Sequence, residues 1–164
     1  MKNFLVIGNP ISHSLSPKLH NFWLKNYNIK ALYAKKRVDE NNLKSIISEI
    51  KSDHIAGINV TVPYKKLIIP FVDELSKSAS ITQSVNTIYK KNGKIIADNT
   101  DIGGFEKALK HINYNVSNKK VFLLGAGGVS SSIIYSLQKM GAANITLTNR
   151  TKQKALEIKK NFQD

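Results

Sequence analysis

Apolar and polar positions in the first hundred residues alternate between the short period of strands and the longer period of helices. Strands are predicted at 4–7, 31–38 and 57–62, and a hairpin at 85–97 with its turn at Asn92-Gly93. One helix is predicted to begin at Ser16-Pro17, with the Ser16 hydroxyl as its cap. A second contains Leu43, Ile46, Ile47 and Ile50, which recur at helical spacing. A third is expected over 67–71, and a further helical turn through Leu75. This alternation indicates an α/β lobe.

The pattern changes after residue 100. A helix over 101–111 is expected to turn Phe105, Ala108 and Leu109 inward. Residues 120–125 then form a continuous apolar run, which is typical of a parallel strand buried on both faces. A glycine-rich turn, a helix, a strand at 145–148 and a helix at 152–162 follow, so a βαβ unit is predicted. The chain is therefore predicted to be α/β throughout, with one lobe at 1–100 and a partial nucleotide-binding lobe at 101–164.

The composition is that of a globular protein with a buried core: 164 residues, 41% hydrophobic and 22% charged. The absence of cysteine excludes a disulfide framework, a zinc–thiolate site and a cysteine nucleophile, and no metal site is predicted. No apolar run approaches the roughly 20 residues that span a bilayer, and 4–7 is too short for a signal sequence. The expected location is therefore cytoplasmic, with no membrane partner.

The net charge of +14 raises the question of nucleic-acid binding. All the cationic side chains except Arg37 and Arg150 are lysines, and they are dispersed over the whole chain. Recognition of base edges and phosphates favours arginine, so solvated lysine faces are the preferred interpretation and no nucleic-acid partner is expected. The charge is expected instead to attract small anionic molecules.

A glycine-rich loop follows the apolar strand at 120–125. Gly125 permits a tight turn, and Gly127 and Gly128 let backbone amides approach a pyrophosphate at a helix N-terminus. Ala126 and Val129 complete the loop, and Ser130 stands where the dinucleotide fingerprint has its third glycine. A strand–helix turn that binds no nucleotide is the alternative interpretation, although the order of strand, loop, helix and strand favours a dinucleotide.

The residues after the next strand indicate the cofactor. NAD-binding proteins of this fold usually have an acidic residue there, which holds the ribose 2′-hydroxyl. This chain has Asn149, Arg150 and Thr151, with Lys154 one turn later. These groups suit a 2′-phosphate and predict NADP. In the alternative interpretation Arg150 is a surface cation and Thr151 caps the last helix.

Several polar residues in the first lobe stand where predicted strands and helices begin or end: Ser14, Ser16, Asn59, Thr61, Lys65, Asn86 and Asn99-Thr100-Asp101. Each also has an ordinary structural interpretation as a helix cap, a turn residue or a solvated lysine. Composition and periodicity leave both interpretations open.

Six segments together resemble the shikimate dehydrogenase family, in family order and spacing over nearly the whole chain. They are Gly8–Pro17, Asn59–Lys65, Val85–Thr87, Asn99–Phe105, Gly125–Gly128 and Asn149–Thr151. The resemblance implies NADP-dependent reduction of 3-dehydroshikimate to shikimate, a step of aromatic amino-acid biosynthesis. It also implies that Ser14 and Ser16 hold the substrate carboxylate, that Asn59 supports the site, and that the ring oxygens are surrounded by Thr61, Lys65, Asn86 and Asp101.

Ketone reduction by hydride places negative charge on oxygen, so a proton or an electrostatic partner is required there. Lys65 is the only cation among the matched residues of the first lobe, and a neighbouring Asp101 carboxylate would keep it protonated. Lys65 and Asp101 are therefore the predicted catalytic residues. Which of the two moves the proton is left open.

The chain departs from the family pattern at three places. Gln83-Ser84 replaces the usual Gly-Ala, and Val129 replaces the usual Ala. Family members also continue well beyond this length, so residues 1–164 alone are expected to turn over poorly. A quinate/shikimate dehydrogenase with relaxed cofactor use and a non-catalytic shikimate-binding fragment are the alternatives, and no oligomeric state is predicted.

Overall fold

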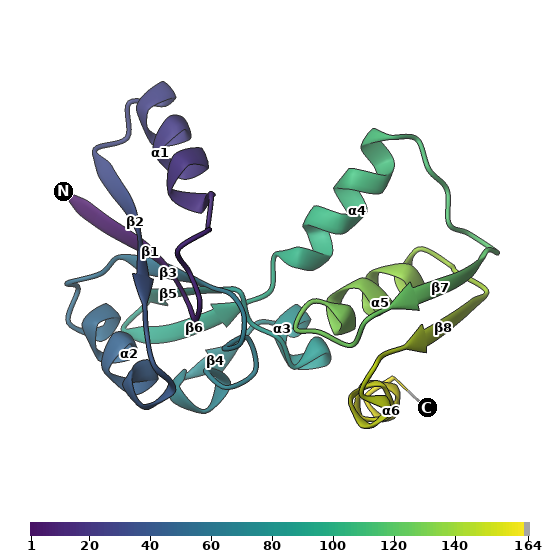
Figure 1. Cartoon of the computed structure of the whole chain (residues 1–164). Helices are drawn as coiled ribbons and strands as arrows, with labels where there is room; N and C mark the ends of the chain where they lie inside the picture. Colours follow the sequence, from purple (N-terminus) through teal and green to yellow (C-terminus); the bar gives the residue numbers. More distant parts are fainter. Residues whose placement is uncertain (163–164) are drawn as a thin grey trace. The chain divides into compact units, whose positions relative to one another are not determined.

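The computed structural model describes residues 1–162 and contains two compact units (Figure 1). The first combines Met1–Ser76 with Val85–Asp98, and the second combines Lys77–Ser84 with the described residues from Asn99 onward. The first unit therefore ends two residues before the expected boundary at residue 100. In addition, the short segment Lys77–Ser84 groups with the second unit, whereas the sequence analysis placed it in the first lobe.

The first unit is built on a six-stranded mixed sheet in the order β2-β1-β3-β5-β6-β4. β1 pairs in parallel with β2 and β3, β5 is antiparallel to β3 and β6, and the short β4 is parallel to β6. The strands are β1 (Lys2–Gly8), β2 (Ala31–Arg37), β3 (Gly57–Val60), β4 (Glu74–Leu75), β5 (Thr87–Lys91) and β6 (Lys94–Asp98).

Two helices pack on this sheet. α1 (Ser16–Asn26) contacts β2, and α2 (Leu43–Lys51), which follows the single-turn η1 (Glu40–Asn42), contacts β5 and β6. The predicted apolar positions of α2 are all buried: Leu43, Ile46, Ile47 and Ile50. Each such side chain contributes about 1.5–3 kcal/mol to folding, so the helical apolar period accounts for much of this core.

The segment between β3 and β5 differs from its prediction. β3 ends at Val60: Thr61 N still donates to Ile7 O (3.0 Å) on β1, but the chain then turns, and Tyr64 N donates to Thr61 O (2.9 Å). The helix expected over 67–71 is a run of turns ending in one 3-10 turn, η2 (Ile69–Phe71), because Pro70 has no backbone N–H to donate. Leu75 lies in β4, where pairing with β6 replaces the expected helical turn, and the unexpected helix α3 covers Lys77–Thr82.

The second unit contains the predicted βαβ arrangement. β7 (Lys120–Leu124) and β8 (Asn144–Thr148) are parallel and are connected through α5 (Ser130–Lys139). α4 (Asp101–His111) packs on α5, and α6 (Lys152–Lys160) packs on β8. The chain is thus α/β, as predicted.

Two burial predictions in this unit are wrong. β7 is covered on one face only: Val121 and Leu123 are partly buried, whereas Phe122 and Leu124, which alternate with them, are 63% and 75% exposed. On α4, Phe105 and Leu109 are partly buried, in line with their predicted inward direction, but Ala108 is exposed and the fully buried side chain is Ile102.

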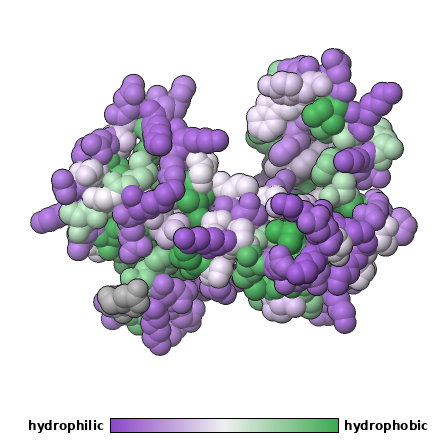
Figure 2. Space-filling view, turned by 180° about the vertical axis from the view of Figure 1, so that it is seen from behind, coloured by the Kyte–Doolittle hydropathy of each residue, from purple (hydrophilic) through white to green (hydrophobic). Residues whose placement is uncertain are grey.

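The surface is largely polar. Figure 2 shows hydrophilic side chains over much of the visible face of each unit, with smaller apolar areas between them. Within residues 1–162 the helices are too short or too polar to cross a lipid bilayer.

Candidate functional site

One edge of the first unit's sheet gathers five of the predicted substrate-binding residues and Asn59. β1, β3 and β6 end at this edge and the antiparallel β5 begins there. Ser14 and Ser16 follow β1, Thr61 and Lys65 follow β3, and Asn86 immediately precedes β5. Ligands of α/β sheets usually bind at the carboxyl ends of parallel strands. The topology therefore brings these side chains to the end of the sheet where a ligand is expected.

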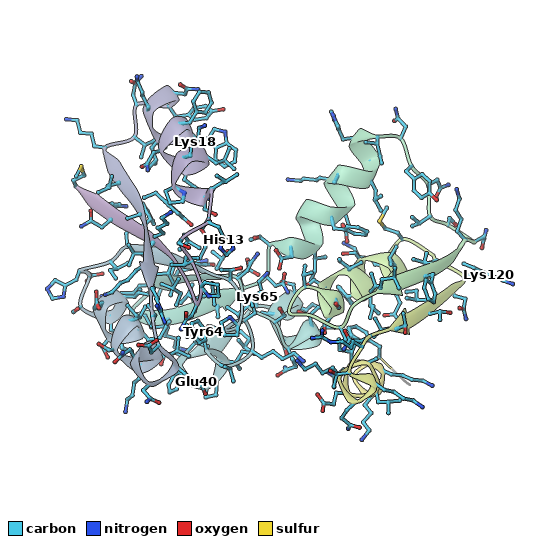
Figure 3. All side chains as sticks on the ribbon, viewed as in Figure 1. His13, Lys18, Glu40, Tyr64, Lys65 and Lys120 are labelled. Atoms are coloured by element: carbon cyan, nitrogen blue, oxygen red, sulfur yellow. The ribbon has the colours of Figure 1, made fainter. Side chains whose placement is uncertain are left out.

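Lys65 is held in a buried position at this edge (Figure 3), with 9% of its surface exposed. Its carbonyl accepts a hydrogen bond from Val85 N (2.8 Å), which ties the turn to the segment before Asn86. The neighbouring Tyr64 is buried and donates from its hydroxyl to Val38 O (2.6 Å). A cation placed in such a desolvated position interacts strongly with charge that develops on a nearby oxygen.

The Asn59 amide is engaged entirely within the protein. Its Oδ1 accepts from the Tyr33 hydroxyl (2.6 Å), and its Nδ2 donates to Asn86 O (3.1 Å) and Thr87 Oγ1 (3.2 Å). The Thr87 hydroxyl donates in turn to Asn86 Oδ1 (3.0 Å). Asn59 therefore positions the residues around Asn86.

The loop from β1 to α1 holds the two predicted carboxylate ligands. Ser14 and Ser16 are both partly buried, and Ser14 Oγ accepts from Ser16 N (3.3 Å). The capping prediction for Ser16 is wrong: Ser16 already lies in the first helical turn, and Leu15, which has no polar side chain, is at the N-cap position. Lys35 Nζ braces the loop by donating to Ser12 O.

Gly8 lets the β1 end lie against the segment that carries Thr61. A Cβ at Gly8 would lie 2.8 Å from Thr61 Cγ2 and 2.9 Å from Val62 O, closer than real Cβ contacts allow. We expect Gly8→Ala to lower the free energy of unfolding by about 1–3 kcal/mol, the usual cost of overpacking, as measured in urea. Gly103→Ala on α4 is the control, since its Cβ would meet no atom within 4 Å. Equal stabilities of the two variants would contradict this prediction.

The glycine loop of the second unit is closed by its own side chains. Gly125 has φ +111°, which favours glycine, and its N donates to Thr148 O (2.8 Å). Ser130 Oγ accepts from Gly127 N (2.9 Å) and donates to Gly125 O (2.8 Å). Ser130 therefore braces the loop, a role that its small size alone did not reveal.

Asn149 also serves the loop. Its Oδ1 accepts from Ala126 N (3.1 Å) and its Nδ2 donates to Thr151 O (2.9 Å), so its amide links the two strand ends of the βαβ unit. Arg150, Thr151 and Lys154 are exposed beside it at the start of α6. Thr151 occupies the N-cap position of α6, but its side chain makes no capping hydrogen bond.

A buried polar cluster joins α3 to the glycine loop within the second unit. Asn99 Nδ2 lies 2.9 Å from Thr82 Oγ1, 2.9 Å from Ser84 O and 2.8 Å from Ser132 Oγ. Ser84 is fully buried and donates from Oγ to Gly128 O (2.8 Å). These bonds explain why Lys77–Ser84 groups with this unit.

Asp101, the second predicted catalytic residue, opens α4 of the second unit. Its backbone N donates to Asn99 Oδ1 (3.0 Å), so the buried cluster also holds the start of this helix. The sequence predicted Asn99 as a turn or cap residue, but nothing in it indicated the hydrogen bonds to Thr82 and Ser132. Ser84 could have been singled out from the sequence, since it departs from the family pattern.

Loss of the Ser84 hydroxyl is expected to loosen the glycine loop. Ser84→Ala removes the donor to Gly128 O, a contribution of about 0.5–1.5 kcal/mol. Amide hydrogen exchange at 126–130 should therefore accelerate by about 2–12-fold. Ser80→Ala, at an exposed position of α3, should leave these rates unchanged. Loop protection that is the same in both variants would show that Ser84 does not hold the loop.

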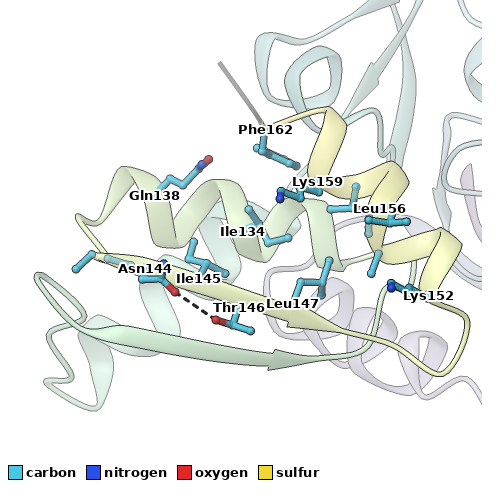
Figure 4. Close-up of a pocket in the computed structure, with 14 residues that line it drawn as sticks. Ile134, Gln138, Asn144, Ile145, Thr146, Leu147, Lys152, Leu156, Lys159 and Phe162 are labelled. Carbon is cyan, nitrogen blue, oxygen red and sulfur yellow. Dashed lines mark hydrogen bonds between the residues drawn. The ribbon is translucent and has the colours of Figure 1, made fainter.

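A cavity of about 590 Å³ lies elsewhere in the second unit, between α5, β8 and α6 (Figure 4). Its lining is largely apolar, with Lys152 and Lys159 at α6, and it contains none of the predicted cofactor-binding residues. Among residues 1–162 no three His, Cys, Asp or Glu side chains are grouped so that they could hold a metal ion.

Two family models match this chain. The family model described as "Shikimate dehydrogenase substrate binding domain" matches residues 6–88, and that described as "Shikimate / quinate 5-dehydrogenase" matches residues 106–164. A shikimate dehydrogenase (NADP(+)) of Pelagibacter ubique (strain HTCC1062) is 57% identical over 163 residues, which cover 99% of this chain and 62% of that protein.

Solved structures agree. The crystal structure of shikimate dehydrogenase from Aquifex aeolicus has a TM-score of 0.92 at 39% identity, over 98% of this chain and 60% of that one. The shikimate 5-dehydrogenase of Thermus thermophilus, in complex with NADP(H) and shikimate, has a TM-score of 0.89 at 31% identity, over 99% and 61% of the two chains. The chain thus spans about three fifths of the length of these relatives.

Proposed function

This chain belongs to the shikimate dehydrogenase family, and on that premise we propose that it serves the NADP-dependent interconversion of 3-dehydroshikimate and shikimate. The observation that supports the proposal is the sheet edge of the first unit, where the buried Lys65 and the hydrogen-bonded Asn86, two residues that the family resemblance implies for substrate, follow and precede neighbouring strands. The first unit would bind the substrate, and the glycine loop would bind the cofactor.

In this proposal Ser14 and Ser16 hold the substrate carboxylate through their hydroxyl groups, and Thr61, Lys65 and Asn86 contact the ring oxygens. Hydroxyl and amide donors suit these oxygens because each can form a hydrogen bond without a second buried charge. Asn59 supports Asn86 through the hydrogen bonds described above.

Lys65 is the proposed catalytic cation. As the ketone is reduced, its oxygen gains negative charge, and Lys65 Nζ would stabilise this oxygen or give it a proton. In the oxidative direction Lys65 together with Asp101 would act as the base that accepts the hydroxyl proton. We also carry Asp101 as a proposed catalytic residue, on the resemblance alone, with the role of keeping Lys65 protonated.

The glycine loop fits NADP. A Cβ at Gly127 would meet no atom within 4 Å, so a ligand can approach the Cα side of the loop, which leads into the ten-residue α5. The amides of Ala126 and Gly127, which donate to Asn149 and Ser130, would exchange these partners for the pyrophosphate. Gly125, Ala126, Gly127, Gly128 and Val129 would hold the pyrophosphate. Arg150, Thr151 and Lys154 would hold the 2′-phosphate, with Asn149 bracing the loop. When bound, NADPH supplies the hydride.

We propose a cytoplasmic protein whose partners are the small-molecule substrate and cofactor, with no nucleic-acid or membrane partner. The dispersed lysines support this view, since they form no arginine-rich recognition surface.

Two measurements test the proposed function. The first is calorimetric titration of residues 1–164 with shikimate, with quinate as the comparison ligand, and shikimate is expected to bind. The second is cofactor reduction by a chimera in which residues 1–164 are followed by the corresponding C-terminal part of the Pelagibacter ubique relative. Shikimate with NADP should be turned over fastest. Turnover led by quinate with NAD would favour the relaxed quinate/shikimate activity, and binding without turnover would favour a binding fragment.

A further inference from the structure

Tyr33 begins a directional chain of hydrogen bonds that crosses the first unit's sheet and ends on Asn86. The Tyr33 hydroxyl, on β2, reaches Asn59 Oδ1 on β3, and Asn59 Nδ2 reaches Thr87 Oγ1 on β5. The Thr87 hydroxyl then reaches Asn86 Oδ1. This series of hydrogen bonds passes over β1 and joins three strands, of which the first and the last contribute residues more than fifty positions apart in the sequence.

The donors and acceptors available to the Asn59 side chain fix the direction of its hydrogen bonds. Asn86 O is a backbone carbonyl, which can only accept, so the amide group that faces it at 3.1 Å must be Asn59 Nδ2. Asn59 Oδ1 therefore faces Tyr33, and the phenol must donate. Thr87 Oγ1 accepts from Asn59 Nδ2 and donates its own proton to Asn86 Oδ1 (3.0 Å).

Tyr33 is held in place by its ring and by its backbone. Its side chain is buried with Val6 and Ile11, and its ring stacks on His20 at 4.1 Å with an interplanar angle of 3°. Asn21 of α1 brackets its backbone, accepting from Tyr33 N (3.0 Å) and donating to Tyr33 O (2.7 Å). Burial raises the pKa of Tyr33 to about 12, so the hydroxyl stays a donor at neutral pH.

We propose that Tyr33 is a positioning residue, which acts through Asn59 and Thr87 to fix the rotation of the Asn86 amide. Because Thr87 engages Oδ1, the Asn86 amide meets a substrate oxygen through Nδ2, as a donor. This selects a hydroxyl or keto oxygen that accepts a hydrogen bond. The inference rests on the proposed function, since it assumes that Asn86 contacts substrate.

The test compares three variants of residues 1–164. Tyr33→Phe removes only the hydroxyl and keeps the ring on His20, and Thr87→Val removes the last donor of the chain while conserving shape. Tyr89→Phe removes another tyrosine hydroxyl from the same sheet, one that lies outside this hydrogen-bond chain. Two quantities are measured: the Kd for shikimate and the NMR signals of the Asn86 side-chain NH₂, assigned by their loss in Asn86→Asp.

Tyr33→Phe and Thr87→Val are each expected to raise Kd by about 3–10-fold, the effect of one hydrogen bond, and to shift or broaden the Asn86 NH₂ signals. Because both act on one amide, the double variant should bind no more weakly than about the weaker single variant. Tyr89→Phe should behave like the unmodified chain.

The inference is overturned if Tyr33→Phe leaves the Asn86 NH₂ signals unchanged, or if the effects of Tyr33→Phe and Thr87→Val on Kd simply add. If the unmodified chain binds no shikimate while Tyr33→Phe still moves the Asn86 signals, the positioning role stands and the substrate assignment fails. The two failures are thus distinguishable, and thermal unfolding of each variant separates either one from a loss of folding.

Discussion

Replacing Lys65 by alanine in the chimera is expected to lower kcat for shikimate oxidation by about 10²–10⁴, with a much smaller effect on KM. This is the usual contribution of a general acid–base group, and Lys65 is the buried cation at the sheet edge where the proposed substrate residues meet. Steady-state rates of NADP reduction measure the effect. The loss belongs mainly to kcat because the charge that Lys65 meets develops during the reaction.

Lys66→Ala is the matched control, because it removes the same charge from the next, exposed position and should leave kcat within about twofold. A Lys65→Ala variant with near-normal kcat would remove Lys65 from the chemistry. Combining Lys65→Ala with Asp101→Asn tests the proposed pairing: if the two residues act as a unit, the double variant should be scarcely slower than Lys65→Ala alone.

Arg150→Ala is expected to weaken NADP binding by roughly 1.5–3 kcal/mol, or about 10–150-fold, and to leave NAD binding almost unchanged. The guanidinium would form a charge-assisted bond to the 2′-phosphate, a group that NAD lacks. Titration of the chimera with each cofactor measures the difference.

Lys152→Ala, at the first residue of α6 and two residues after Arg150, controls for the general loss of positive charge, and it should weaken NADP binding less than Arg150→Ala does. Equal losses of NADP and NAD affinity in Arg150→Ala would contradict the assignment of this residue to the 2′-phosphate. Asn149 offers a contrast: because its amide braces Ala126 and Thr151, its replacement should affect both cofactors alike.

Local sequence patterns determined much of this protein. The helical period of Leu43, Ile46, Ile47 and Ile50 specified α2 and its buried face. The run at 120–125, the glycine loop and the apolar positions that follow specified a parallel βαβ unit. These features depend on neighbours a few residues apart, so the spacing of apolar side chains and glycines is sufficient to predict them. The motifs that resemble the family were equally local.

Only the tertiary structure decided the features that depend on distant partners. Leu75 lies in a strand because β6 supplies its pairing groups. Alternation along β7 fixes which side chains share a face, but only the packing of the described residues decides that the face with Phe122 and Leu124 stays open. The same holds for the polar contacts: Ser84 meets Gly128 across 44 residues and Tyr33 meets Asn59 across 26. A hydroxyl or amide can bond to any group that the fold brings within about 3 Å, so its partner is determined by the arrangement of strands and helices and carries no local signal.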